Sequence, residues 1–360
     1  MTLEPSLAPA EALGQAMIPY LARPPCLVSF SGGRDSSVIL AVATAVARRE
    51  GLELPVPITQ LFPNAPGADE SSWQELVIRH VQPPDWIRHV VHDEFDLVGP
   101  VAAEVLLEHG VLFPANIHSM LPLLREVRGG SLLTGFDGDS LLRTWRWERA
   151  ASVLAGRVRP APRDALRIGL ALAPGAIRAR RLRRKEAQDL PWLLPEAREA
   201  VVRASLAEAA AEPFAWDKRV RWLTRRRYLA VTLESSALLA KQAGAAVASL
   251  FLDPPFLASL ARAGGTLGFG DLRRLLREQF GLLLPDEIVS RPGKAGFDDV
   301  FWGPHSRRLI TRWAGKPVPI ARIDPSGLHE TWSQARPHAL SGSALQALWL
   351  ASHAQQAFDG

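Results

Sequence analysis

Six consecutive residues near the start of the chain have the types and the spacing of an anion-binding loop. They read Ser31-Gly32-Gly33-Arg34-Asp35-Ser36. Paired glycines let the backbone approach a ligand closely and adopt positive φ, and the serine hydroxyls add hydrogen-bond donors. If a helix begins directly after the glycines, its free N–H groups and positive dipole end also face the ligand. Together these features predict a binding site for phosphate or pyrophosphate.

The carboxylate of Asp35 restricts the ligands that this loop can hold. A carboxylate repels a polyphosphate unless a cation lies between them, and Mg²⁺ commonly bridges carboxylate and phosphate oxygens. No Gly-Lys-Ser/Thr follows the glycines, so the loop is not a Walker loop, and no Gly-x-Gly-x-x-Gly is present, so it is not a dinucleotide-binding loop. A plain Gly-rich turn between a strand and a helix is a weaker explanation of the full six-residue pattern. It is similar to the loop of the PP-loop ATP pyrophosphatases, which cleave ATP to AMP and pyrophosphate.

A second glycine-containing acidic turn follows further along the chain. Residues 131–140 read Ser-Leu-Leu-Thr-Gly-Phe-Asp-Gly-Asp-Ser, an apolar strand followed by the turn. Because loops after parallel strands gather at one edge of a sheet, we expect Asp137 or Asp139 near Asp35. Two carboxylates, pyrophosphate oxygens and waters would complete an octahedral Mg²⁺ site. The alternative is an ordinary Asp-Gly turn, in which these residues are favoured for backbone reasons.

Two cations lie in a Gly-rich segment nearer the C-terminus, which reads Arg291-Pro292-Gly293-Lys294-Ala295-Gly296-Phe297. Lys294 could neutralise the charge that develops on a leaving pyrophosphate. Arg291 could do the same as a planar, forked donor. Taken alone, a surface loop with two solvated cations is the simpler interpretation.

In this order, the three segments resemble the synthetase domain of the asparagine synthetase family, which includes β-lactam synthetases and lasso-peptide cyclases. Residues 251–256, Phe-Leu-Asp-Pro-Pro-Phe, are also similar to the Pro-Phe-Leu-Asp segment of that family. The resemblance covers about residues 10 to 305. It implies ATP as a substrate and Mg²⁺ as a cofactor.

The resemblance also assigns expected site residues. Lys294 and Arg291 are the expected catalytic residues, and Asp35 and Asp139 are the expected metal ligands. The residues expected to bind ATP and pyrophosphate are Ser29, Ser31, Gly32, Gly33, Asp35, Ser36, Gln60, Thr134 and Gly135.

The acidic turn departs from the family pattern, which is usually Ser-Gly-Glu-Gly-x-Asp-Glu. This chain has Phe136 in place of the first glutamate and Ser140 in place of the last. A phenylalanine cannot accept a proton, so aspartate amidation is not the expected reaction, and a bulkier or less polar acid or a different amine fits better. If the reaction needs a general base, the candidates elsewhere are His118, Asp137, Tyr228 and Glu234.

The expected reaction is the formation of an amide bond with ATP. A small-molecule or peptide carboxylate would be adenylated, AMP and pyrophosphate would be released, and ammonia or an amine would attack. Thr2 stands where the family's glutaminase domain has its cysteine, so a separate amidotransferase or biosynthetic partner protein could supply the nitrogen. Two alternatives stay open: a tRNA-modifying PP-loop enzyme, favoured by basic runs, and a nucleotide-binding non-catalytic subunit, favoured by Phe136.

The elements that must position these residues alternate as β-α-β-α-β-α-α-β. The expected strands are 26–30, 56–62, 86–91 and 131–134, and the expected helices are 8–22, 35–49, 69–81, 97–109 and 117–128. This order predicts an α/β fold with a parallel twisted sheet of the PP-loop (adenine nucleotide α-hydrolase-like) type. Mostly helices are expected afterwards, so we divide the chain into an ATP-binding core, 1–147, and a helical part, 148–360. The two could form one continuous domain.

The composition is typical of a soluble globular protein, with 47% hydrophobic and 22% charged residues. The single cysteine, Cys26, excludes an internal disulfide framework and a cysteine-built zinc site. No secretory signal or membrane span is evident, so the cytoplasm is the expected location. The net charge of +5 is concentrated in runs at 178–185 and 225–227. Such runs can bind nucleic acid, but solvated helix faces are the simpler interpretation of them.

Overall fold

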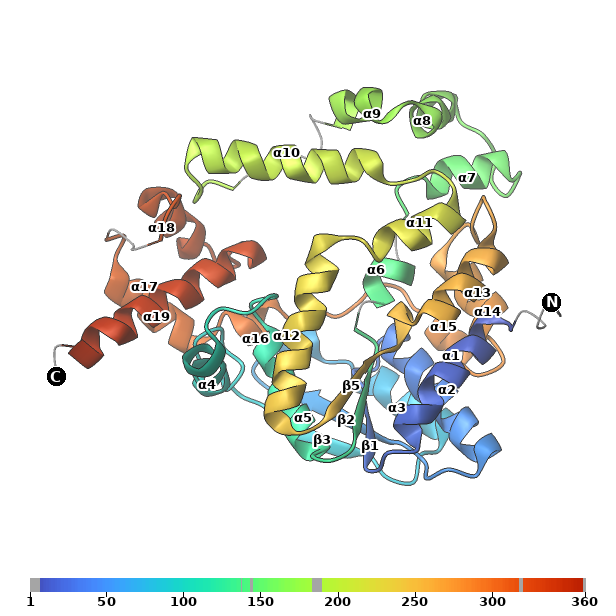
Figure 1. Cartoon of the computed structure of the whole chain (residues 1–360), viewed down its shortest axis with the longest axis horizontal. Helices are drawn as coiled ribbons and strands as arrows, with labels where there is room; N and C mark the ends of the chain where they lie inside the picture. Colours follow the sequence, from blue (N-terminus) through green and yellow to red (C-terminus); the bar gives the residue numbers. More distant parts are fainter. Residues whose placement is uncertain (1–6, 137, 143–144, 183–189, 317–319, 359–360) are drawn as a thin grey trace.

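A five-stranded parallel sheet forms the centre of the molecule, with strand order β3-β2-β1-β4-β5 (Figure 1). The computed structural model describes residues 7–136, 138–142, 145–182, 190–316 and 320–358. The strands are β1 (Cys26–Ser29), β2 (Val56–Leu61), β3 (Ile87–Val90), β4 (Ser131–Thr134) and β5 (Ala246–Ser249). The predicted α/β fold with a parallel sheet is confirmed.

The two central strands are buried on both faces, as parallel strands usually are. Val28 of β1 and Leu133 of β4 belong to a core shared with α1 (Pro9–Leu21) and α2 (Arg34–Glu50). Their neighbours Leu27 and Leu132 face the opposite core, which is formed with α5 (Met120–Glu126) and α12 (Arg227–Ala243). Helices therefore cover both faces, and the loops after β1 and β4 are held at one edge of the sheet.

The strand β5 is the main difference from the predicted elements. The sequence predicts mostly helices after residue 147, but Ala246–Ser249 pairs with Ser131–Thr134 at the side of the sheet next to β4. It follows directly from α12, which ends at Gly244 in the left-handed conformation, with φ 67°. The second half of the chain thus supplies a strand as well as helices, and the division at residues 147 and 148 stays a prediction.

The remaining helices lie partly around this sheet and partly beyond it (Figure 1). In the first half they are η1 (Pro66–Ala68), α3 (Ser71–Val81), α4 (Pro100–His109) and η2 (Ile117–Ser119). In the second half they are α6 (Gly138–Leu142), α7 (Glu148–Leu154), α8 (Pro162–Leu172), α9 (Gly175–Leu182), α10 (Pro195–Ala211), α11 (Trp216–Leu223), η3 (Leu250–Leu252), α13 (Pro254–Gly264), α14 (Leu272–Phe280), α15 (Asp286–Ser290), α16 (Asp298–Phe301), α17 (Pro304–Trp313), α18 (Pro325–Ser333), η4 (Ala339–Ser341) and α19 (Gly342–Phe358). Of these, α8, α9 and α10 lie along the top of the view and α17, α18 and α19 at the left (Figure 1). None of the described helices has the length and apolar character that a membrane crossing requires.

The helix α3 begins two residues later than predicted, for a local reason. Asp69 accepts a hydrogen bond from the backbone N–H of Ser71 at 2.9 Å, which is the geometry of an Asx turn. Glu70 therefore lies outside the helix, with φ −123°. Its side chain is free to turn inwards, and it is only 5% exposed.

Candidate active site

The predicted anion-binding loop lies between β1 and α2. Gly32 has φ 83°, a conformation that favours glycine. The backbone N–H of Ser31 donates to Oγ of Ser36 at 3.3 Å, and Oγ of Ser37 donates to the carbonyl of Gly33 at 2.7 Å. The loop is thus folded back onto the first turn of α2. This is the strand–loop–helix arrangement that the sequence predicts.

A cavity of about 560 Å³ opens beside this loop. The predicted site residues that line it are Ser29, Ser31, Gly33, Asp35, Ser36, Thr134, Gly135, Asp139, Arg291 and Lys294. Gly32 is not among the lining residues. Gln60 lines a smaller neighbouring cavity of about 110 Å³, which shares Ser29 and Ser31 with the larger one. Its Nε2 donates to the carbonyl of Ser119 at 3.1 Å.

The acidic turn after β4 is in direct contact with the loop after β1. A Cβ atom on Gly138 would lie 2.7 Å from Cγ of Asp35, so the turn can pass at this distance only with glycine there. Asp35 and Asp139 line the same cavity. The expectation that the two loops meet at one edge of the sheet is therefore confirmed for Asp139, whereas Asp137 lies outside the described residues.

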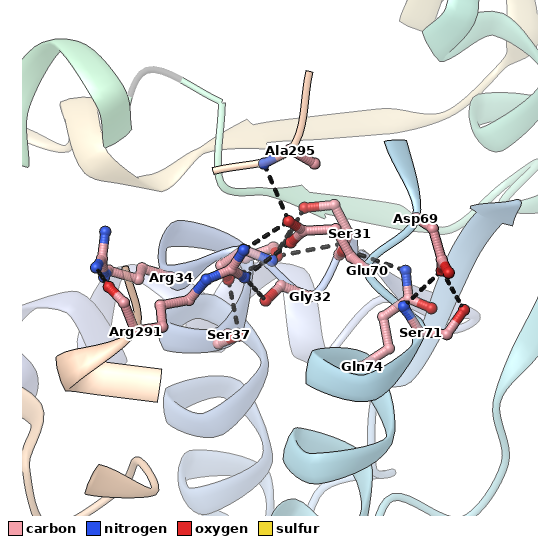
Figure 2. Close-up of polar contacts among 12 residues, drawn as sticks. Ser31, Gly32, Arg34, Ser37, Asp69, Glu70, Ser71, Gln74, Arg291 and Ala295 are labelled. Atoms are coloured by element: carbon pink, nitrogen blue, oxygen red, sulfur yellow. Dashed lines mark hydrogen bonds and ion pairs between the residues drawn. The ribbon is translucent and has the colours of Figure 1, made fainter. Parts of the chain in front are cut away.

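The two cations near the C-terminus have different surroundings. Nζ of Lys294 forms an ion pair with Oδ2 of Asp139. The guanidinium of Arg291 instead donates to both carboxylate oxygens of Glu70, at 2.6 and 2.8 Å, and to the carbonyl of Gly32 at 2.9 Å (Figure 2). Its side chain is 4% exposed. Direct contact of Arg291 with pyrophosphate stays a prediction.

The order of these segments and their meeting at one cavity agree with a comparison against protein families. The model of the asparagine synthase family matches residues 10–349. The chain belongs to the asparagine synthase family. Membership indicates a PP-loop type domain and, at the level of the family, an ATP-dependent, amide-forming ligase. A search of curated proteins finds no match for the chain.

Two carboxylates in this asparagine synthase family site could hold Mg²⁺. Among the described residues, no group of three or more His, Cys, Asp and Glu side chains is arranged to bind a metal. Mg²⁺ usually binds through one or two carboxylates and completes its shell with water and substrate phosphates. Asp35 and Asp139 therefore fit a Mg²⁺ that arrives with the nucleotide, rather than one in an all-protein cage.

Much of the cavity lining is apolar, and polar side chains such as Asn116, Ser119 and Thr232 lie among the apolar ones. The apolar side chains that contribute to it are Phe113, Pro114, Met120, Leu123, Leu132, Phe136, Leu272, Phe297 and Phe301. Phe136, which replaces the family glutamate, is 38% exposed. The hydroxyl of Tyr228 donates to Oγ of Ser140, and both residues line the cavity. The charged residues on the described lining are confined to positions 34, 35, 139, 291 and 294.

The proposed general bases are not equally placed. His118 is 1% exposed and does not line the cavity. Its ring nitrogens lie 3.1 Å from the carbonyl of Ala115 and 3.0 Å from that of Phe95. Burial lowers the pKa of His118, while the two backbone carbonyls and the charge of Asp96 act in the opposite direction. His118 is therefore a buried core histidine rather than a group of the cavity. Glu234 is exposed on α12 and away from the lining, whereas Tyr228 remains at the cavity.

Sequence reasoning missed Glu70 as a residue of this site. In the sequence it looks like one of two acidic residues at a helix N-terminus, where such residues are common. A buried carboxylate must be paired or hydrogen-bonded, but neither the burial of Glu70 nor its partner 221 residues away can be seen in the sequence.

Proposed function

We propose that this member of the asparagine synthase family forms an amide by adenylating a carboxylate. A carboxylate oxygen would attack the α-phosphorus of ATP, the bond to the bridging oxygen would break, and pyrophosphate would leave. The nitrogen of an amine or ammonia would then attack the acyl carbon, and AMP would leave as the nitrogen loses a proton. The observation that carries this proposal is the meeting of Asp35, Asp139 and Lys294 at one cavity beside the phosphate-binding loop.

The residues of the cavity divide the work in this proposal. The loop after β1 binds the phosphates through backbone N–H groups and serine hydroxyls. Asp35 and Asp139 would hold Mg²⁺, which would supply positive charge to neutralise the phosphates. Lys294 stabilises the charge that builds on pyrophosphate. The ion pair with Asp139 keeps this lysine at the cavity before the nucleotide arrives.

We further infer that the acid is less polar than aspartate. Phe136 occupies the position of the family glutamate, and much of the cavity lining is apolar. A charged group on the distal part of a substrate would be desolvated there without a described partner, which is costly. Small-molecule acids with aliphatic or aromatic groups, or the carboxylate of an apolar peptide, suit this lining. The nucleophile would be ammonia or an amine, supplied freely or by a partner protein.

The test is to incubate the protein with ATP, Mg²⁺, ammonia or simple amines, and a panel of acids. The panel contains aspartate, aliphatic and aromatic acids, and short peptides. We expect AMP and pyrophosphate in equal amounts with apolar acids, and little with aspartate. The Lys294→Ala variant is the control for contaminating enzymes. If no acid supports pyrophosphate release or pyrophosphate–ATP exchange, the proposed function is wrong.

A further inference from the structure

The segment that carries Lys294 has no helix or strand of its own between residues 291 and 297. Contacts with other parts of the chain must therefore fix where the lysine lies. The backbone N–H of Gly296 donates to the carbonyl of Gly67 at 3.0 Å. The backbone N–H of Ala295 donates to Oε1 of Glu70 at 3.1 Å. Both acceptors precede α3, so the segment before α3 anchors the lysine segment.

Glu70 holds the lysine segment at two points (Figure 2). Its Oε1 accepts from Nη2 of Arg291 at 2.6 Å as well as from Ala295, and its Oε2 accepts from Nη1 of Arg291 at 2.8 Å. Arg291 and Ala295 stand on either side of Lys294 in the sequence. One buried carboxylate therefore brackets the lysine, and both side chains of the ion pair are 4% exposed.

The same ion pair joins the lysine segment to the phosphate-binding loop. Nη1 of Arg291 also donates to the carbonyl of Gly32 at 2.9 Å, and Nη2 of Arg34 donates to the carbonyl of Arg291. The guanidinium of Arg291 lies over the ring of Trp73, 4.8 Å from the ring centroid. These contacts come from the loop after β1, from α2 and from α3, so they hold the backbone of the lysine segment beside the loop before any ligand binds.

A carboxylate suits this position better than an apolar side chain. Buried ion pairs are weak evidence for stability, because an apolar pair of similar volume often stabilises a fold as well or better. A carboxylate, however, can accept a forked guanidinium and a backbone N–H at once. Glu70 does not line the cavity, so it acts only through the residues that it holds.

We propose that Glu70 is a positioning residue that holds Lys294 at the phosphate end of the cavity through Arg291 and Ala295. Arg291 is then chiefly part of this anchor, and not a group that meets the leaving pyrophosphate. The proposal rests on the proposed function for the identity of the anion, which is pyrophosphate. The anchoring itself does not depend on that identity.

The anchor is tested first without any ligand, by hydrogen–deuterium exchange of residues 291–297. In Glu70→Gln we expect the amides of Ala295 and Gly296 to exchange at least about tenfold faster, because local opening costs less. Glu75→Gln is the matched control, since Glu75 is exposed on α3, the helix that follows Glu70. Glu70→Asp keeps the charge but is one methylene shorter. It therefore distinguishes a side chain that no longer reaches its partners from a protein that no longer folds.

The effect on Lys294 is tested by calorimetric titration with magnesium pyrophosphate. We expect Glu70→Gln to weaken binding by roughly the same factor as Lys294→Ala, and the double variant to be no weaker than Lys294→Ala alone. Residues that act through one another give such non-additive effects, whereas a general loss of stability would add to the effect of Lys294→Ala.

The outcomes separate this inference from the proposed function. Unchanged exchange in both Glu70 variants overturns the anchor. Faster exchange with unchanged pyrophosphate affinity, or with additive effects, overturns the positioning of Lys294. If the unaltered protein does not bind magnesium pyrophosphate, the proposed function fails and the positioning of Lys294 for that anion fails with it, while the exchange measurement still decides the anchor.

Discussion

Asp139 contacts the lysine of the site and lies at the same cavity as the second carboxylate. It pairs with Lys294 and lines the cavity with Asp35. We expect Asp139→Asn to lower pyrophosphate release by about 100-fold or more, because an amide neither holds Mg²⁺ well nor keeps the lysine in place. The rate of pyrophosphate release measures this. The control is Asp85→Asn, which changes an exposed carboxylate before β3, and equal losses in the two variants would contradict a special role for Asp139.

Phe136 should determine which acids the site accepts. Phe136→Glu places a carboxylate among the apolar side chains of the lining, so we expect kcat/KM for an apolar acid to fall by about 10- to 100-fold. Phe136→Leu keeps this position apolar and should cost much less. Rates with each acid of the panel, for both variants, measure the change. If the two variants lose activity equally, the polarity of this position does not select the substrate.

The burial of His118 should make the stability of the protein, rather than its catalysis, depend on pH. Its ordinary pKa of 6.5 is lowered in the folded protein by burial. The unfolded chain therefore takes up a proton at this histidine at a higher pH than the folded chain does. The contribution of His118 to stability is complete above pH 6.5 and is lost as the pH falls through the lowered folded pKa.

The measurement is urea unfolding at pH 7.5 and pH 5.5, two conditions chosen on either side of the ordinary histidine pKa (about 6.5). We expect the free energy of unfolding to fall more for the unaltered protein than for His118→Asn. The slope is the change in the free energy of unfolding per pH unit. The slopes of the two proteins should differ by no more than the binding of one proton allows, about 1.4 kcal/mol per pH unit. His80→Asn, at an exposed histidine, is the control and should keep the original slope. Equal slopes for the unaltered protein and His118→Asn would refute the assignment.

At the level of elements, the short helix α6 depends on Arg219 of α11. The guanidinium donates to the carbonyls of Ser140 and Leu141, both at 3.2 Å, and to Oε1 of Glu212 at 3.1 Å. The last carbonyls of a helix lack partners within it, and a cation at that end is favourable. Arg219 thus holds the helix that begins with Gly138 and carries Asp139.

Removing Arg219 should therefore affect both stability and the acidic turn. Arg219 is 2% exposed, and Arg219→Met would leave the carboxylate of Glu212 buried without this partner. Because Arg146 still pairs with Glu212 at 3.4 Å, we expect the free energy of unfolding, measured in urea, to fall by about 1–3 kcal/mol. Arg203→Met is the control, because Arg203 pairs with Glu199 on the surface, where such pairs contribute about 0–1 kcal/mol. Similar losses in both variants would contradict this role of Arg219.

The elements differ in how well the sequence predicts them. The helix α2 is predicted almost to the residue, because Val38, Ile39, Val42 and Val46 recur on one face and are all buried. The strand β5 is not predicted, because its four residues, Ala-Val-Ala-Ser, have no alternation and obtain their strand geometry from pairing with β4. Local patterns reveal helices that bury one face, but not short segments that depend on a distant partner.

The site divides in the same way. The loop after β1 and the acidic turn after β4 carry their chemistry in consecutive residues, and the parallel sheet brings them together. The pairing of Glu70 with Arg291 depends on tertiary packing. Phe113 and Leu272 also reach the cavity only through tertiary packing, because they line it from separate segments of the chain. Sequence motifs therefore predict the part of the cavity proposed to bind phosphate, whereas the part proposed to bind the acid requires the structure.

At the level of the whole molecule, the net charge of +5 raises the question of nucleic-acid binding. Part of the basic run at 178–185 lies outside the described residues. Of the described arginines nearby, Arg226 pairs with Glu208 at 2.7 Å, and Arg178 donates to the carbonyl of Glu212 at 2.7 Å. Arg178 and Arg226 are therefore structural arginines, whereas Arg180, Arg181, Arg225 and Arg227 are exposed, as expected for a solvated surface.

We therefore expect only weak binding of bulk tRNA, without nucleotide turnover. Binding should be measured at low and at physiological salt, with pyrophosphate release recorded in parallel. A protein with several phosphate contacts loses affinity steeply with salt, by about 10³-fold or more for six contacts over a fourfold increase. Tight, strongly salt-dependent tRNA binding together with ATP turnover would instead favour a tRNA-modifying enzyme.

The late position of β5 has a consequence for the synthesis of the protein in a cell. A ribosome adding about 5–20 residues per second needs roughly 6–22 s to proceed from Thr134 at the end of β4 to Ala246 at the start of β5. During this interval the nascent chain presents the unpaired N–H and C=O groups of β4, a template on which another chain can pair. Chaperone demand and co-translational aggregation should therefore be greatest while the ribosome translates the helices between these two strands.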